Sequence, residues 1–364
     1  MALVFLYRMK KDDYNIVGVM SGTSLDGIDL VYANFHFDGN WHFKMIHSET
    51  VGYPSNWEDT LRNLVSYKLE DLKTIDAQYT PYLAEIINNF IQKHQLKGID
   101  AVCSHGHTAL HQPENGLTYQ IGNLPILAEL IRNKVVCDFR VEDVALGGQG
   151  APLVPIGDAL LFSEYGFCLN LGGFSNISTQ FEENRMAYDI CPVNIVLNWY
   201  AKQLGLDYDD EGKIASTGTI HAELLHKLNE LAFYKAPYPK SLGLEWVDKT
   251  IFPLINAYEM EIKDILKTFV EHIAIQIASE INKKIDVSVL VTGGGAYNTY
   301  LMHRIKTLSK NKIIIPSKAI IEFKEALIFG FLGVLKLRNE VNCLKSVTGA
   351  IKNHSSGHIY LPKK

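Results

Sequence analysis

The amino-acid sequence predicts an α/β fold built from two similar domains. The 364 residues contain the same order of elements twice: three antiparallel strands, a helix, a strand and a helix. Each copy has a polar, glycine-bearing turn after its first strand, at Ser21–Gly27 and at Gly172–Asn176. The length also suits about two domains of roughly 150–180 residues. A single doubly wound sheet with insertions is the alternative arrangement of these elements.

The first copy starts with a strand over the run NIVGVM, Asn15–Met20, and its second strand covers Ile28–Phe37. Asp38-Gly39-Asn40 is a hairpin signal, so the run Trp41–Tyr53 becomes the third strand. Helical patterns follow at about 57–67 and 75–94. The remaining elements are strands at Ile99–Ser104, Leu117–Ile121 and Lys134–Cys137, with a helix at about Leu124–Arg132.

The second copy repeats this order. Its three strands are predicted at Gly166–Leu171, Ile177–Phe181 and Met186–Ile190. The other elements are helices at about Val193–Gln203 and Glu259–Lys284, a strand at Val287–Thr292, a helix from near Tyr297-Asn298 and a last helix at about Phe323–Arg338. Apolar residues recur in the long helix close to helical period.

The segment Val141–Asp158 lies between the two copies and is rich in glycine and proline, which is typical of a hinge. We therefore expect one domain to comprise residues 1–140 together with about 340–364. The other domain is expected to cover 141–339, with a cleft between the two.

Composition excludes several classes of function. The net charge is −5, which does not favour nucleic acid or an anionic membrane as a partner. The N-terminal apolar run is too short to span a bilayer and lacks a signal-peptide pattern. Five cysteines are scattered without CxxC spacing, so we expect buried thiols and neither a disulfide framework nor a zinc site. These features favour a cytoplasmic protein.

The two glycine turns are candidate phosphate-binding loops. The first offers hydroxyls and backbone N–H groups that can point toward an anion, and the second has the same character at the equivalent place. Asp26 and Asp29 add carboxylates suited to Mg²⁺. An ordinary polar hairpin explains either turn alone, but the pairing favours a polyphosphate held from both sides. Neither turn matches a Walker A loop or GxGxxG.

Three further groups are candidates for chemistry. Gly293-Gly294-Gly295 follows an apolar strand, where missing Cβ atoms let a flat ring or ribose lie against the backbone. Asp189 ends a strand and is placed either as a general base or as the N-cap of the next helix, which Pro192 would open. The histidines of His105-Gly106-His107 favour hydrogen bonding to a sugar or a neighbouring loop over metal ligation.

At these residues the sequence resembles the anhydro-N-acetylmuramic acid kinase family, within the actin, Hsp70 and hexokinase fold group. The resemblance runs from about Val17 to Pro362. The segments that carry it are GVMSGTSLDGID from Gly18, SHGHT from Ser104, QIGN from Gln120, DFR from Asp138, GGQGAPLVP from Gly147, NLGGFSNIS from Asn170, GGGAYN from Gly293 and SVTGA from Ser346.

The resemblance implies two ribonuclease-H-like domains, Mg·ATP in the cleft and a homodimer. It also implies a reaction in which 1,6-anhydro-N-acetylmuramic acid, water and ATP give N-acetylmuramic acid 6-phosphate during peptidoglycan recycling. Asp189 corresponds to the catalytic base. The family's DTGPGN is here Asp189-Ile190-Cys191-Pro192-Val193-Asn194, so two small or polar positions near the base become Ile190 and Val193.

The glycine turns and the resemblance together give the expected binding residues. The ATP phosphates and Mg²⁺ would be held by Gly22, Thr23, Ser24, Leu25, Asp26, Gly27, Ile28, Asp29, Gly172 and Gly173, with Asp26 or Asp29 facing the metal. The nucleoside side would comprise Gly293, Gly294, Gly295 and Asn298. The sugar side would comprise Glu325, Arg140, Asp143, His107 and Asn194.

Two other functions remain possible from the sequence. A conventional hexose or amino-sugar kinase would use the same aspartate on a free hydroxyl. An ATP-driven chaperone or filament protein of the same fold group is the second, although only a short tail follows Ser346–Ala350.

Overall fold

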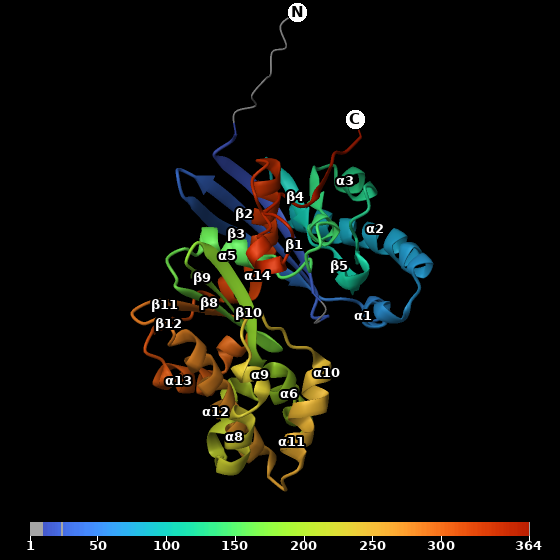
Figure 1. Cartoon of the computed structure of the whole chain (residues 1–364). Helices are drawn as coiled ribbons and strands as arrows, with labels where there is room; N and C mark the ends of the chain where they lie inside the picture. Colours follow the sequence, from blue (N-terminus) through green and yellow to red (C-terminus); the bar gives the residue numbers. More distant parts are fainter. Residues whose placement is uncertain (1–9, 23–24, 364) are drawn as a thin grey trace, which may run out of the picture. The chain divides into compact units, whose positions relative to one another are not determined.

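The computed structural model describes residues 10–22 and 25–363, which fall into two compact units. Unit 1 contains the chain up to Leu161 and again from Phe323 onward, and unit 2 contains Phe162–Glu322. Figure 1 shows the helices and strands of both units. The predicted α/β class is confirmed.

Unit 1 is built on a six-stranded sheet in the order β13-β7-β4-β1-β2-β3. Its strands are β1 (Asp13–Ser21), β2 (Ile28–Phe37), β3 (Trp41–Val51), β4 (Ala101–Ser104), β7 (Val135–Cys137) and β13 (His358–Tyr360). The pairs β1–β2 and β2–β3 are antiparallel, whereas β4 runs parallel to both β1 and β7. A small separate sheet pairs β5 (His107–Gln112) with β6 (Leu117–Ile121).

Helices cover both faces of this sheet. The helical segments of unit 1 are α1 (Ser55–Arg62), η1 (Leu64–Ser66), α2 (Leu69–Lys93), η2 (Pro113–Asn115), α3 (Ile126–Ile131), α4 (Val141–Ala145), α5 (Val154–Leu161), α15 (Lys345–Thr348) and most of α14 (Lys318–Leu337). Val17 and Val19 of β1 pack into the core formed with α2 and α3. Gly18 faces the other way, toward α14, because side chains alternate along a strand; a Cβ there would lie 2.2 Å from the carbonyl oxygen of Ala326.

Unit 2 contains a five-stranded sheet in the order β10-β9-β8-β11-β12. Its strands are β8 (Phe167–Leu171), β9 (Phe174–Phe181), β10 (Asn184–Pro192), β11 (Ser288–Thr292) and β12 (Lys312–Ile314). The first three strands form an antiparallel meander, and β11 runs parallel to β8 and β12. This strand order and these directions match those of β3-β2-β1-β4-β7 in unit 1.

The helical segments of unit 2 are α6 (Asn194–Lys202), η3 (Asp210–Gly212), α7 (Lys213–Thr217), α8 (Ala222–Asn229), α9 (Ala232–Lys235), α10 (Leu244–Trp246), η4 (Val247–Ile251), α11 (Phe252–Asn256), α12 (Ile262–Ile281), η5 (Gly294–Tyr297) and α13 (Thr299–Leu308). The apolar face of α12, including Phe269 and Ile273, packs into one core with α6, α8 and strands β8 and β11.

The predicted domain boundaries differ from the observed ones. Residues 141–161 and 323–339 lie in unit 1. Helix α14 belongs there because Gly330 lies against Ile16 and Gly18 of β1, where a side chain would crowd the strand. The segment Val141–Asp158 is not a linker between the units. It contains α4 and α5, and the Gln149 N–H donates to the carbonyl oxygen of Thr348 within unit 1.

All five cysteines are buried thiols that form no disulfide. Across residues 10–22 and 25–363, no helix combines the length and hydropathy that crossing a bilayer requires.

Candidate active site

Asp189 is held at an irregular point of the β9–β10 pair. The pairing register shifts between Asp189 and Cys191, which takes Ile190 out of the ladder. The Asp189 N–H donates instead to the carbonyl oxygen of Lys240, at 3.0 Å. This bulge directs the backbone of β10 toward the segment Lys240–Leu242.

The Asp189 carboxylate has one engaged and one available oxygen. Its Oδ2 accepts hydrogen bonds from the Leu242 N–H at 2.8 Å and the Ser241 hydroxyl at 3.1 Å. Its Oδ1 accepts none from any residue that the structure describes. Burial raises the pKa of Asp189, and the two hydrogen bonds partly offset that rise. The carboxylate is therefore oriented, and one oxygen is left to accept a proton.

Asp189 is not the N-cap of the following helix. The residue at that position is Val193, with no capping hydrogen bond from its side chain. Pro192 ends β10 and does not open α6, because its backbone still pairs with Phe174. Of the two placements open from sequence, the N-cap is excluded, and a role for Asp189 as a base stays a proposal.

The second glycine turn packs onto the start of α6. The N–H groups of Val193 and Ile195 donate to the carbonyl oxygen of Gly173, and the Asn194 N–H donates to that of Gly172. Gly173 is exposed, and a Cβ there would meet only Ile195, at 3.9 Å. This exposed backbone leaves room for a ligand to approach closely.

The three-glycine turn lies beside it. Gly293 has φ +83°, and a Cβ would come within 2.5 Å of Asn170 Oδ1, so the fold requires glycine there. Gly294 is open by contrast, with Asn194 Nδ2 at 3.9 Å from a Cβ as the nearest group. Asn194 donates from this Nδ2 to the carbonyl oxygen of Leu171. The structure thus brings Gly172, Gly173, Gly294 and Asn194 together.

Asn298, assigned to the nucleoside side, has a structural contact. Its Oδ1 accepts a hydrogen bond from the Leu301 N–H at 2.9 Å and caps α13. A Cβ at Gly212 would lie 2.3 Å from this oxygen, which fixes glycine at that neighbouring position.

The first glycine turn joins β1 to β2, and its predicted residues Thr23 and Ser24 lie outside the described residues. The Leu25 N–H donates to the Gly22 carbonyl at 3.3 Å. Gly27 has φ +144°, and a Cβ would lie 2.6 Å from the Val51 carbonyl oxygen. Ile28 is buried at the start of β2, so only its backbone is placed to meet a ligand.

The two carboxylates of this turn have different surroundings. Asp26 is exposed. Asp29 is half-buried in β2 and accepts a hydrogen bond from the Thr50 hydroxyl at 2.6 Å. Carboxylate oxygens in such positions suit Mg²⁺, either directly or through its waters. The donor set therefore fits the expected ion.

His107 lies in a buried polar cluster at the end of β1. Its Nδ1 is 2.7 Å from Ser21 Oγ, which also lies 3.1 Å from the Tyr79 hydroxyl. Burial lowers the pKa of His107 to about 4. The ring is therefore neutral at physiological pH. It supports the strand that leads into the first turn.

Arg140 is oriented by two contacts. Its Nε donates to His105 Nε2 at 2.9 Å and its Nη1 donates to the Gly150 carbonyl at 2.6 Å. His105 can accept because its Nδ1 is 2.8 Å from the Gly106 carbonyl, which fixes the proton on Nδ1. Burial and the nearby Arg140 charge keep the pKa of His105 well below its usual range. Nη2 of the half-buried guanidinium has no protein partner among the described residues.

Glu325 of α14 lies in the electrostatic field of this arginine. Restricted hydration raises the pKa of the Glu325 carboxyl, and the Arg140 charge opposes that rise. A carboxylate and a guanidinium so placed suit the hydroxyl and carboxylate groups of an acidic sugar.

Asp143 is fully buried, and protein groups surround its carboxylate. The Gly150 N–H donates to Oδ2 at 2.7 Å, and the Thr348 hydroxyl donates to Oδ1 at 2.7 Å. Asp143 therefore fixes the Gly147–Gly150 loop whose Gly150 carbonyl orients Arg140. Its carboxylate is therefore not placed to contact a ligand directly.

Sequence reasoning missed two residues of these sites, Ser241 and Leu242, which hold the Asp189 carboxylate. It singled out His105 as a hydrogen-bonding histidine but did not predict that this residue orients Arg140. Ser241 and Leu242 lie more than 50 positions from Asp189, in a stretch without periodicity. The sequence signal for His105 was its place in SHGHT, next to His107.

Two α/β units of matching strand order, each with a glycine turn after its first strand, define a protein of the actin and hexokinase fold group. The anhydro-N-acetylmuramic acid kinase family model matches residues 14–362, and the chain belongs to this family. A kinase of this description from Mannheimia succiniciproducens is 36% identical, over 94% of this chain and 98% of its own. One from Haemophilus influenzae is 32% identical, over 98% of this chain and 99% of its own.

Proposed function

We propose that this protein uses ATP and water to convert 1,6-anhydro-N-acetylmuramic acid into N-acetylmuramic acid 6-phosphate, in the recycling of peptidoglycan. Membership of the family supports the substrate. The observation that carries the chemistry is the Asp189 carboxylate, with Oδ2 fixed by Ser241 and Leu242 and Oδ1 available.

The reaction needs a base that acts on water. In the anhydro sugar O6 is bonded to C1, so O6 has no proton to lose. Asp189 Oδ1 takes a proton from a water that attacks C1, as the base of an inverting glycosidase does. The C1–O6 bond breaks, its electron pair goes to O6, and O6 attacks the γ-phosphorus of ATP. The bond from the γ-phosphorus to the β,γ-bridging oxygen breaks, and ADP leaves with that electron pair. The proton remains on Asp189 until it is released to solvent.

The remaining residues bind and orient the two substrates. We assign the ATP phosphates to the backbone of Gly22–Asp29 and of Gly172–Gly173, and the nucleoside to Gly293–Gly295 and the segment around Asn298. Mg²⁺, held by Asp26 or Asp29, would supply charge stabilisation at the phosphates. Arg140, Glu325, His107 and Asn194 form the sugar side, with Asp143 supporting Arg140.

We further propose that the protein acts in the cytoplasm, where ATP is available, and that it forms a homodimer. Analytical ultracentrifugation of the full chain tests the second point, since a monomer at micromolar concentration would contradict it.

The function is tested by mass spectrometry of the products formed from Mg·ATP and the anhydro sugar in ¹⁸O-labelled water. We expect a phosphorylated sugar that carries the label at C1. Preformed N-acetylmuramic acid 6-phosphate in the same water, without protein, corrects for spontaneous exchange. A conventional hexose or amino-sugar kinase would instead phosphorylate a free hydroxyl without incorporating label, and a chaperone or filament protein would hydrolyse ATP without any sugar requirement.

Replacing Ser241 with alanine should move the acid side of the pH–rate profile to higher pH. The base works only when deprotonated, so activity is lost as pH falls through the pKa of Asp189. The Ser241 hydrogen bond lowers that pKa, and its removal therefore raises it. The plateau rate of the variant at high pH should stay within about tenfold of the wild-type rate, because only one hydrogen bond is lost. Ser241→Thr keeps the hydroxyl and is the control. A pH–rate profile of S241A identical to that of the wild type would contradict the role of Ser241.

A further inference from the structure

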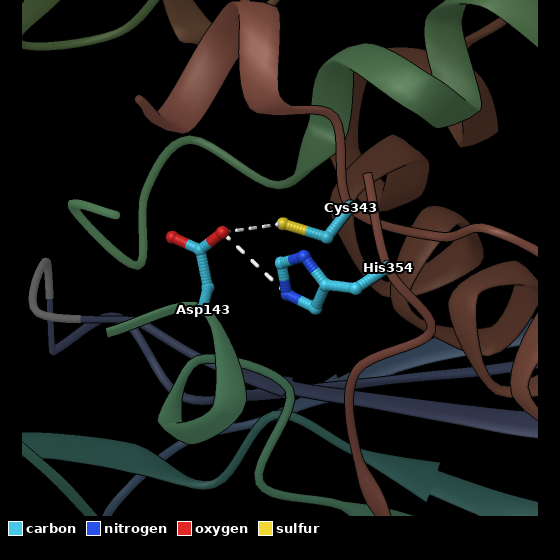
Figure 2. Close-up of side chains that lie close together, drawn as sticks. All are labelled: Asp143, Cys343 and His354. Atoms are coloured by element: carbon cyan, nitrogen blue, oxygen red, sulfur yellow. Dashed lines mark hydrogen bonds and ion pairs between the residues drawn. The ribbon is translucent and has the colours of Figure 1, made fainter. Parts of the chain in front are cut away.

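Three ligand-bearing side chains meet in the interior of unit 1. Asp143 comes from α4, and Cys343 and His354 come from the C-terminal segment on either side of α15. Their exposures are 0%, 1% and 5%. One ligand atom from each lies within 4.8 Å of the others. Figure 2 shows the thiol and the imidazole directed at the same carboxylate.

His354 has an unsatisfied nitrogen at this point. Its Nδ1 is 3.1 Å from the carbonyl oxygen of Lys352, which can only accept, so Nδ1 carries the proton. In the neutral ring Nε2 is then a bare lone pair. This buried Nε2 has no hydrogen-bond partner and lies 3.5 Å from Asp143 Oδ1. A lone pair facing a carboxylate oxygen is repulsive unless a cation, either a metal ion or a proton on Nε2, lies between them.

The three ligand atoms lie close to the spacing of a tetrahedral zinc site. Zinc bonds of about 2.0–2.3 Å place neighbouring ligand atoms roughly 3.3–3.7 Å apart. Asp143 Oδ1 is 3.5 Å from His354 Nε2, within that range, and 3.0 Å from Cys343 Sγ, which is a hydrogen-bond distance that lengthens when the thiol proton is replaced by a metal ion. A hydrogen bond from Nδ1–H to a backbone carbonyl is also the usual support for a histidine that binds metal through Nε2.

The charges favour a divalent ion in so buried a place. Without metal, the Cys343 thiol donates a hydrogen bond to Asp143 Oδ1, at 3.0 Å. A divalent ion displaces that proton to solvent and binds one thiolate, one carboxylate and one neutral imidazole. The resulting cluster has no net charge, which lowers the cost of burying it.

We infer that Asp143 Oδ1, Cys343 Sγ and His354 Nε2 form a structural zinc site that fastens the C-terminal segment to α4. Thiolate, imidazole and carboxylate together select Zn²⁺ over Mg²⁺ or Ca²⁺. Three protein ligands leave one tetrahedral position for a water. The sequence analysis predicted no zinc site because CxxC spacing is absent. A local motif could not reveal this site, since Asp143 and Cys343 lie 200 positions apart.

The test measures zinc in the full chain, produced in zinc-supplemented medium without a polyhistidine tag. Elemental analysis should find stoichiometric zinc. Competition with a chelator should show that Cys343→Ser and His354→Gln each weaken zinc affinity by more than the ~10–100-fold that losing an outer-shell partner costs. Chelation should lower the melting temperature of the wild type, because an ion that binds only the folded state stabilises it.

Matched controls come from the same unit. Cys137→Ser removes another buried thiol and His358→Gln removes a nearby exposed histidine, and both should keep wild-type zinc. Cobalt soaked into the zinc-free wild type should give a thiolate-to-metal charge-transfer band, which tests the site even if the variants fail to fold. Negligible zinc with no such band would overturn the assignment, and so would wild-type zinc affinity in both C343S and H354Q. Either result would leave an ordinary His354–Asp143 ion pair.

Discussion

Asp189→Asn is expected to lower kcat at least about 10²-fold, the usual minimum for losing a general base. Asparagine keeps the size of the side chain and can still accept the Leu242 N–H bond through its oxygen. It cannot take a proton from the attacking water. Because the hydrogen bond that orients this side chain is kept, we expect the affinity for Mg·ATP to be nearly unchanged. Steady-state kinetics and calorimetry measure the two effects separately.

The control for this variant is Asp248→Asn, which neutralises an exposed aspartate of the same unit. Its turnover should equal that of the wild type. If D189N instead turned over normally, the base would lie elsewhere, and Glu325 with its raised pKa would be the next candidate. Loss of ATP affinity together with turnover would indicate a disturbed phosphate site.

Gly173→Val is expected to remove most nucleotide affinity from a folded protein. A Cβ at Gly173 meets only Ile195, at 3.9 Å, so the fold has space for a side chain there. The branched group would occupy the position from which the backbone must approach a phosphate. Losing one hydrogen bond to a charged group costs about 1.5–3 kcal/mol, or about 10- to 100-fold in Kd for Mg·ATP.

Gly52→Val provides the matched control, since a Cβ at Gly52 meets nothing within 4 Å and no ligand role is assigned to that position. Both variants should unfold at the wild-type temperature, and only G173V should lose affinity in calorimetry. Unchanged binding by a folded G173V protein would exclude Gly172–Gly173 from the phosphate site.

The strands of both sheets were predictable where apolar runs end at turn-forming residues. β1, β2 and β3 match their predicted ranges closely because Asp38-Gly39-Asn40 marks the hairpin. Strands β12 and β13 were missed, since each has only three residues, and β13 also depends on β7, a partner strand far away in sequence. The short helices α7–α11 were missed because their segment has no sustained period.

The residues of the site were predictable by motif, but their contacts were not. Asp189 was located from the end of its strand, yet its alternative role as an N-cap was excluded only by the contacts with Ser241 and Leu242. Asp143 was expected beside the sugar and is instead fully buried. Such differences arise from pairings between distant segments, which no local pattern encodes.

The division of unit 1 between two stretches of chain bears on the order of events during synthesis. Unit 2 is one continuous segment, so all of its sheet emerges from the ribosome before Phe323 does. The opening strands of unit 1, made first, must wait for α14 to cover one face of β1 and for β13 to complete the sheet edge. Because domains fold as units while the chain grows, the part of unit 1 that is translated first is the last to become native. Its apolar strands stay exposed on the nascent chain until the C-terminal segment has been made.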